Sequence, residues 1–438
     1  LTSGAGNTAV GYQAGDNLDG GSYNTLLGYQ ALSAEDGHGY NVAVGYQALL
    51  VQNAGANAAN VAVGYQAGLA ITTGGDNIII GASAGDLMTT AGACILIGKN
   101  AGTAIAAGQV TTNGTVCIGA EAGAAITEAA ANIAIGYQAM QEHTTGQNNI
   151  AIGYQAMDKT GHGNCPESDG NIFIGKNAGG GIWANNDCNY NIGIGNHVMS
   201  GVMDDALNNV AMGHNVLPAL TSGDSNVCVG YAAGVAIIGA SQNVCVGTNA
   251  GNTITSGGAN TCIGQDTDTI AAGTNTINIG NSAVTDGSNK GRWGNSSVST
   301  NNIQTDWTVD SDRRIKDDIK DSDLGLSFIN LLKTKTFVKI HPADYPEPLL
   351  EERYKSGGGN YDDSKNEIIR DEFDDKKVWN GLIAQEVKES MDSLGVDFSG
   401  WSEENNSKQG VTYSTLVMPL IKAVQELSAK VKALEDAQ

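Results

Sequence analysis

Aliphatic and small residues alternate in a short pattern that recurs along the first two thirds of the chain. Near Asn41 it has the form N-V-A-V-G-Y-Q-A, and looser versions continue to residue 280. There are 16 copies, and nine of the fifteen spacings between their glycines are 17 residues. Such a period predicts a parallel β-solenoid with one coil per copy and insertions in the turns. The aligned glycines are Gly11, Gly28, Gly45, Gly64, Gly81, Gly98, Gly119, Gly136, Gly153, Gly175, Gly195, Gly213, Gly230, Gly247, Gly264 and Gly280.

The columns of the repeat predict which side chains face the inside of each coil. One and three places before the glycine, every copy has an aliphatic residue or Thr, as at Val42 and Val44. These positions share one side of a strand, and we expect them to fill the coil. The residue between them is usually small, as at Ala43, which favours close packing of that face against identical chains.

A column of asparagines precedes each strand. Asn occupies the position four places before the glycine in 13 of the 16 copies. Because Asn tolerates left-handed backbone conformations, we expect it to turn each coil together with the glycine.

Charge and glycine divide the chain near residue 310. Residues 1–310 contain 52 of the 60 glycines and carry a net charge of -16 (5 minus 21), whereas residues 311–438 carry -7 (18 minus 25). This acidic balance argues against nucleic acid as a partner, because phosphate binding needs a basic surface. No apolar run approaches the roughly 20 residues of a membrane span, so we expect no membrane insertion. We expect attachment to virion or tail proteins through a segment that precedes Leu1.

The repeat resembles a known family. NTAVGYQAG, NVAVGYQAL and NIAIGYQAM are similar to the head repeats of YadA-like trimeric autotransporter adhesins, which also occur in phage tail fibres. The resemblance covers residues 1 to about 285 and implies a homotrimeric, left-handed parallel β-roll. The period here is longer than that of the adhesin repeats, which is usually nearer fourteen residues. We therefore expect repeats over 1–284 and a β-rich neck over 285–310.

Residues 311–438 resemble the auto-cleaving intramolecular chaperone domain of phage tailspikes, tail fibres and endosialidases. The resemblance rests on SDRRIKDDI, LGLSFINLLKTKTFVKI, GLIAQEV and VTYSTLVMPLIKAVQEL, in this order. It implies a small α+β domain that templates trimerisation. It also implies cleavage between Asp310 and Ser311 by a dyad of Ser311 and Lys316.

The chemistry of this dyad is plausible for the residue types present. The Ser311 hydroxyl would attack the Asp310 carbonyl, and Lys316 must be neutral to accept the hydroxyl proton. Burial or the neighbouring cations Arg313 and Arg314 would favour that neutral form. The structural alternative is that Ser311 caps a helix that runs through Ile315 and Ile319, with Asp312 in its first turn.

The C-terminal segment predicts a parallel trimeric coiled coil over about 414–436. Its apolar positions alternate at spacings of three and four, as a coiled-coil seam requires. The seam consists of Val417, Leu420, Val424, Leu427, Val431 and Leu434.

Several other residues invite a chemical interpretation. We expect Cys117, Cys228, Cys245 and Cys262, which occupy the small column, to be buried apolar groups. A disulfide between Cys165 and Cys188 is possible, because both lie in insertions of neighbouring coils. There is no C-x-x-C pair, so we expect no structural zinc site, and no motif indicates a cofactor.

Histidines and tyrosines have a default structural interpretation. We expect His38, His143 and His162 to be solvated in polar turns, and His197 and His214 to lie near each other in adjacent coils. The Tyr-Gln pairs after the glycines could form aromatic and amide ladders or, alternatively, a glycan-binding stripe.

These patterns favour an extracellular trimeric fibre of a virus, a tail fibre or spike that attaches to a host surface glycan or protein receptor. The C-terminal domain would direct folding and cleave itself off. The alternatives are a glycan-degrading tailspike, for which no pair of carboxylates at a defined separation is visible, and a bacterial trimeric surface adhesin.

Overall fold

The computed structural model describes residues 4–105, 113–127, 130–161, 167–298, 311–347, 349–350, 354–356, 360–370, 373, 375–403 and 407–437. The chain divides into two compact units, Leu1–Trp293 and Gly294–Gln438.

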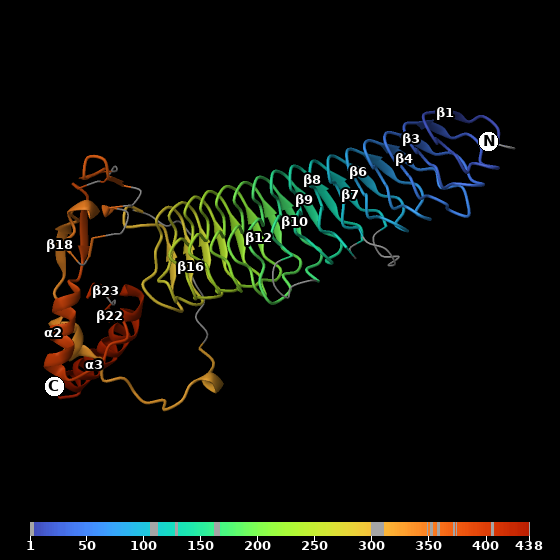
Figure 1. Cartoon of the computed structure of the whole chain (residues 1–438). Coiled ribbons are helices and arrows are strands. Elements are labelled where there is room, and N and C mark those ends of the chain that lie inside the picture. The colour runs from blue at the N-terminus through green and yellow to red at the C-terminus, as the bar shows by residue number, and fades with distance from the viewer. Residues whose placement is uncertain are drawn as a thin grey trace. The chain divides into compact units, whose positions relative to one another are not determined.

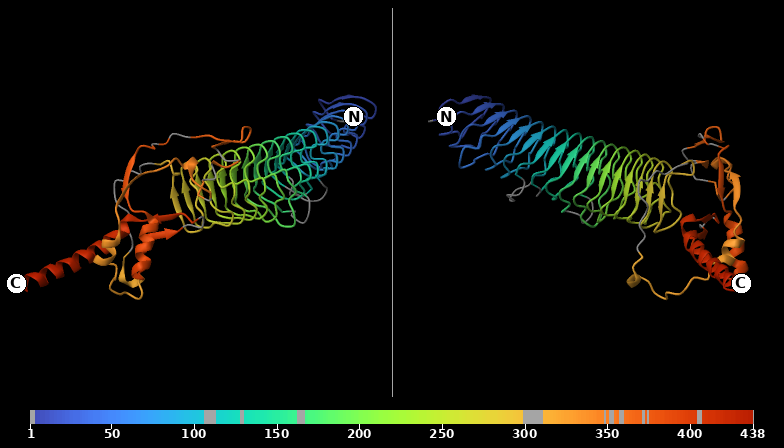
Figure 2. Two further views of the ribbon diagram at one scale, coloured as in Figure 1. Left: turned by 90° about the vertical axis from the view of Figure 1, so that its left-hand side faces the viewer. Right: turned by 180° about the vertical axis from the view of Figure 1, so that it is seen from behind.

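The first unit is a parallel β-solenoid, as predicted (Figures 1 and 2). Each coil contributes one three-residue strand, which pairs in parallel and in register with the strands before and after it, as Val227 does with Val244. The sheet continues through β17, into the segment predicted to be a neck. The strands are β1 (Thr8–Val10), β2 (Thr25–Leu27), β3 (Val42–Val44), β4 (Val61–Val63), β5 (Ile78–Ile80), β6 (Ile95–Ile97), β7 (Val116–Ile118), β8 (Ile133–Ile135), β9 (Ile150–Ile152), β10 (Ile172–Ile174), β11 (Ile192–Ile194), β12 (Val210–Met212), β13 (Val227–Val229), β14 (Val244–Val246), β15 (Thr261–Ile263), β16 (Ile277–Ile279) and β17 (Gly291–Trp293).

The inside and outside of the strands are the reverse of the prediction. The small middle residue points into the coil and is fully buried, as Ala43 and Ala134 are. The flanking aliphatic residues point outward and are partly or largely exposed. The reason is the narrow interior: long side chains from the opposite turn, such as Leu49 and Ile71, fill the space and leave room only for a small residue.

The glycine that follows each strand is required by the stacking of the coils. At Gly45, φ is +136°, and a Cβ atom would lie 2.2 Å from the carbonyl oxygen of Gly64 in the next coil. No other residue fits that approach, because the clash is with backbone.

The asparagine column has a different role from the predicted one. The left-handed residue is the one before the asparagine, such as Tyr40 with φ 66°. The asparagines themselves form a buried ladder: Asn41 donates its backbone N–H to Oδ1 of Asn24 at 2.9 Å, and Asn60 donates to Asn41 at 3.0 Å. An amide side chain can both accept from one coil and donate to another, which explains the choice of Asn.

The second unit is a small α+β arrangement with its own core of Phe328, Val387, Met391 and Phe398. The segment that begins with GLIAQEV contains the amphipathic helix α2 (Ala384–Leu394), whose C-terminus is capped by Gly395 in the left-handed region. The remaining elements are η1 (Arg313–Ile315), α1 (Leu326–Leu331), β18 (Lys335–Val338), η2 (Pro342–Asp344), β19 (Tyr361–Asp362), β20 (Glu367–Ile368), β21 (Val378–Gly381), β22 (Trp401–Glu403), β23 (Gln409–Val411), η4 (Tyr413–Leu416) and α3 (Val417–Glu435).

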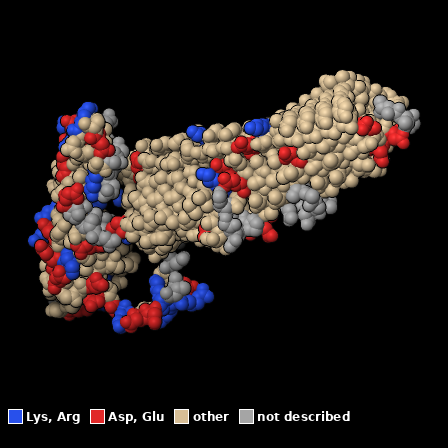
Figure 3. Space-filling model, viewed as in Figure 1, with Lys and Arg blue, Asp and Glu red and all other residues tan. Residues whose placement is uncertain are grey.

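Charge is distributed unevenly between the units. On the face shown in Figure 3, charged side chains are sparse over the solenoid and dense over the second unit. Among the described residues, no helix has the length and apolarity that a membrane crossing requires.

Candidate functional site

The outward columns on the strands form an extended apolar feature of the solenoid. We call it the aliphatic ladder: the first and third residues of strands β1 to β16. Eight of its hydrophobic side chains are exposed by more than a third, and most others are half-buried by their stacked neighbours. The eight are Val10, Leu27, Ile78, Ile80, Met212, Val227, Ile263 and Ile277.

The area of the aliphatic ladder is large for a free surface. At roughly 40 Å² per side chain, two residues in each of 16 coils expose on the order of 1,200 Å², whereas the largest patch on a typical monomer is about 300–600 Å². Surfaces of this kind mark sites of association.

Aromatic and amide ladders run beside it, as predicted for the Tyr-Gln pairs. The rings of Tyr29 and Tyr46 stack with centroids 5.2 Å apart and planes 9° from parallel. The amides of Gln30 and Gln47 are joined by a hydrogen bond of 3.0 Å. Because each tyrosine face is covered by the next ring, only edges and hydroxyl groups are exposed within the stack. Carbohydrates stack on ring faces, so this geometry disfavours a continuous glycan-binding stripe.

The structure brings Ser311 and Lys316 together. Lys316 Nζ donates a hydrogen bond to Ser311 Oγ at 2.6 Å, the contact that a serine–lysine dyad requires. Both side chains are exposed in the single chain. Asp310, the other side of the predicted cleavage bond, lies outside the described residues.

The segment after Ser311 is not the predicted helix. It forms only the single 3₁₀ turn η1, and its N-cap is Asp312, which accepts from the backbone N–H of Arg314 at 2.9 Å. The Arg314 guanidinium also pairs with this carboxylate at 2.6 Å and lowers the pKa of Asp312. The turn η1 ends at Ile315, because the backbone is extended at Lys316. Ser311 is therefore no helix cap, and the short turn is what places it near Lys316.

Helix α3 presents the predicted seam to solvent. Its buried side is short, with Pro419 and Ala423, and Glu426 accepts from the backbone N–H of Leu326 at 2.8 Å. The seam residues are exposed by 47–68%: Val417, Leu420, Val424, Leu427, Val431 and Leu434. A monomer gains nothing from such exposure, so the helix has a second unpartnered apolar surface.

The cysteine prediction is confirmed for the small column. Cys117, Cys228, Cys245 and Cys262 are fully buried. Burial raises the pKa of the Cys117 thiol, which keeps it protonated and unreactive. Cys188 is also buried, but Cys165 lies outside the described residues, so their disulfide stays a prediction.

The histidine predictions are partly wrong. His143 is buried, with Nδ1 2.9 Å from the Thr160 hydroxyl and Nε2 3.0 Å from the Gly146 carbonyl oxygen. His38 lies beside the buried Glu35. His197 and His214 do meet, with ring centroids 6.1 Å apart, whereas His162 lies outside the described residues.

The fold defines the class of protein: a β-solenoid of about 16 turns joined to a small α+β unit. Comparison of the sequence with family models gives no match. Comparison with curated proteins gives none either.

Proposed function

We propose that this chain is the shaft and C-terminal assembly unit of a homotrimeric viral fibre. The observation that carries the proposal is the aliphatic ladder. Three copies around a common axis would cover it along the whole length of the solenoid, and parallel α3 helices would cover their seams in the same assembly. One trimer would then bury both the aliphatic ladder and the seam of α3.

The resemblance of the repeats and of residues 311–438 to phage fibre proteins supports a viral origin. We infer a tail fibre or spike that contacts a host surface glycan or protein receptor. The α3 helices would bring three chains into register before the slow, non-local pairing of the solenoid strands begins.

Cleavage before Ser311 belongs to the same proposal. Attack of Ser311 Oγ on the Asp310 carbonyl, with the hydroxyl proton passing to Lys316 and from there to the leaving amide nitrogen, breaks the C–N bond and moves the acyl group from nitrogen to oxygen. Water then hydrolyses the ester and leaves a carboxylate on Asp310 and a free amine on Ser311. Because the dyad is solvent-exposed in one chain, assembly would have to supply the enclosure that a base of this kind needs.

The oligomeric state of the full chain, measured by analytical ultracentrifugation, tests whether the protein is a trimer. Glutamate would replace three exposed ladder residues, and the matched control would place glutamate at three similarly exposed aliphatic residues outside the ladder. We expect trimers of wild type and control and a loss of trimers in the ladder variant. A monomeric wild type, or trimers in all three proteins, would refute the proposal. The ladder residues are Leu27, Ile78 and Ile80, exposed by 38–50%; the controls are Val51, Leu87 and Ile182, exposed by 40–56%.

Intact mass under denaturing conditions tests the cleavage separately. We expect a wild-type fragment that ends at Asp310 and its absence in Ser311→Ala and Lys316→Met. Full-length wild-type chains in a trimer would make residues 311–438 a permanent cap and would remove the enzymatic part of the proposal.

A further inference from the structure

One turn of the solenoid places a carboxylate at a buried position. Seven places after the aligned glycine, several coils have buried apolar residues such as Leu18, Ile71 and Met88, whereas the coil after Glu35 has the buried amide Gln52. The second coil has Glu35 there, with no exposed surface. A buried carboxylate costs folding free energy unless it is paired, so the contacts of Glu35 indicate what it does.

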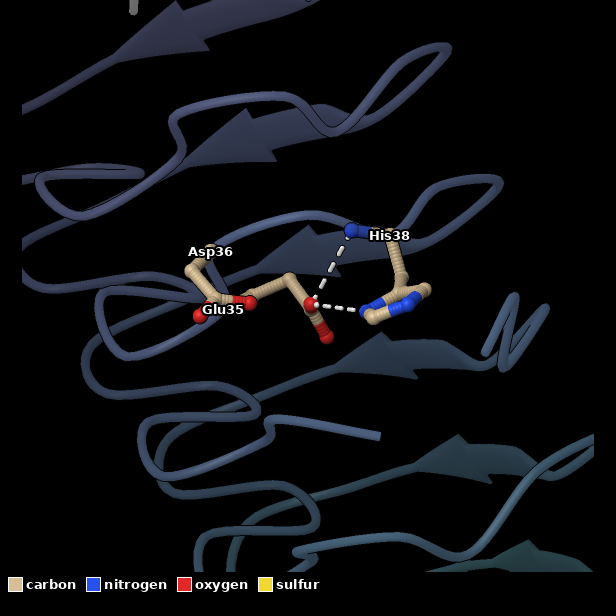
Figure 4. Close-up of side chains that lie close together, drawn as sticks. All are labelled: Glu35, Asp36 and His38. Atoms are coloured by element: carbon tan, nitrogen blue, oxygen red, sulfur yellow. Dashed lines mark hydrogen bonds and ion pairs between the residues drawn. The ribbon is translucent and has the colours of Figure 1, made fainter. Parts of the chain in front are cut away.

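The same turn adds two further ligand-type side chains. Glu35 Oε1 lies 3.1 Å from Nδ1 of His38 and also accepts from the His38 backbone N–H at 3.1 Å. Asp36 follows directly in the turn, and one ligand atom from each of the three residues lies within 4.8 Å of the others. Figure 4 shows Glu35 and His38 turned toward each other, with Asp36 beside them.

We propose that the turn of residues 35–38 binds a divalent transition metal ion of the Zn²⁺ type through Glu35, Asp36 and His38. Metal–ligand bonds of about 2.0–2.2 Å place adjacent ligands of one ion roughly 3.0–3.5 Å apart. The 3.1 Å separation of Nδ1 and Oε1 fits this arrangement as well as it fits a hydrogen bond. Asp36 is exposed, so its side chain is free to rotate and complete the set.

The donor set and its surroundings indicate the class of ion. One imidazole and two carboxylates suit Zn²⁺, Ni²⁺ or Co²⁺ better than Ca²⁺ or Mg²⁺, which prefer oxygen ligands alone. The next coil supports the second oxygen of Glu35: Gln52 Nε2 and the Ala54 backbone N–H each lie 3.4 Å from Oε2. Such outer contacts orient a metal-binding carboxylate.

The solenoid provides an internal comparison. His143 occupies the same column in another coil, but its two ring nitrogens meet a hydroxyl and a carbonyl oxygen, and the following residues are Thr144 and Thr145. That histidine has a structural role. The second coil differs in holding a carboxylate at the buried position, an acidic neighbour and an imidazole three residues on.

Zn²⁺ titration of the full chain, followed by calorimetry and by competition with a chromophoric chelator, tests the proposal. We expect one saturable site per chain in the wild type. His38→Gln and Glu35→Leu should abolish it, and Asp36→Asn should weaken the affinity tenfold or more. Glu35→Leu restores the aliphatic residue of the column, so the variant should fold.

The matched control is Asp76→Asn, which removes an exposed turn carboxylate from a coil without this triad and should bind Zn²⁺ like the wild type. Ca²⁺ in place of Zn²⁺ should give no saturation at the same concentrations. A wild type that binds no Zn²⁺ while Glu35→Leu changes stability would show a buried ion pair only and overturn the proposal. Equal binding by all variants would overturn it too, because the ion would then bind elsewhere.

Discussion

Replacement of one column glycine by alanine should weaken the solenoid far more than other glycine substitutions do. At Gly136 φ is +137°, and a Cβ would lie 2.3 Å from the carbonyl oxygen of Gly153. The unfavourable φ costs about 1–3 kcal/mol. The overlap would also separate the coils and disturb the 2.8 Å bond from Gly153 N–H to the Ile135 oxygen, at about 1 kcal/mol more. We expect a loss of about 2–4 kcal/mol from Gly136→Ala on these grounds.

Substitutions at two other glycines separate the cost of the left-handed backbone from the cost of the overlap between coils. Gly55 has φ +65° but nothing within 4 Å of a Cβ, so Gly55→Ala should cost only the left-handed penalty of about 1–2 kcal/mol. Gly37 has neither a positive φ nor a neighbour within 4 Å, so Gly37→Ala should be neutral or stabilising by up to about 1 kcal/mol.

Hydrogen exchange measured by mass spectrometry, with urea unfolding midpoints, gives the readout. Because solenoid stability is a sum over neighbouring coils, Gly136→Ala should lose protection mainly in the coils around β8 and β9. Protection equal to that of the wild type, or an equal loss from Gly55→Ala, would show that close approach of the backbones is not what selects glycine.

The remaining predictions concern the buried polar groups. Asn226→Ala removes both bonds that Asn243 donates to the Asn226 Oδ1, each 3.0 Å, and should lower stability by about 2–4 kcal/mol in urea unfolding. Asn226→Thr, which copies Thr276 of the last coil, should cost less. Burial raises the pKa of Asp268 to about 6, so the folded state holds its proton while the unfolded state ionises. Wild-type stability should therefore fall by up to about 3 kcal/mol between pH 4 and 6.5, and Asp268→Asn should flatten this slope. Burial lowers the pKa of His143, so stability that depends on its neutral form should be lost as pH falls below about 6.5, and His143→Gln should remove that dependence.

The solenoid could be predicted because its repeat is strict. The period predicted one coil per repeat, and the strands lie where the alternation of residues predicted them. Alternation separates two faces but does not say which one is inward, because that depends on the volume between opposite walls. A sequence signal for the inward face lies seven places after the glycine, where Leu18, Ile71 and Met88 fill the interior of their coils.

One candidate site was expected before the structure was known, and the other was not. The dyad of Ser311 and Lys316 was expected from the resemblance of residues 311–438, and the single turn between the two residues brings their side chains into hydrogen-bond contact. Glu35 and His38 were missed because polar turn residues are usually solvated. Only the column that Glu35 shares with aliphatic residues of other coils shows that its turn faces inward.

Because the strands pair in register, the length of the solenoid depends on the number of coils and not on the number of residues in each coil. The coil between Gly153 and Gly175 has 22 residues and that between Gly264 and Gly280 has 16, yet each advances the sheet by one strand. Each unit adds about 4.8 Å, whatever its number of residues. Insertions in the turns can therefore vary the surface freely while the length stays constant, and the removal or duplication of a complete coil changes the length by a fixed step.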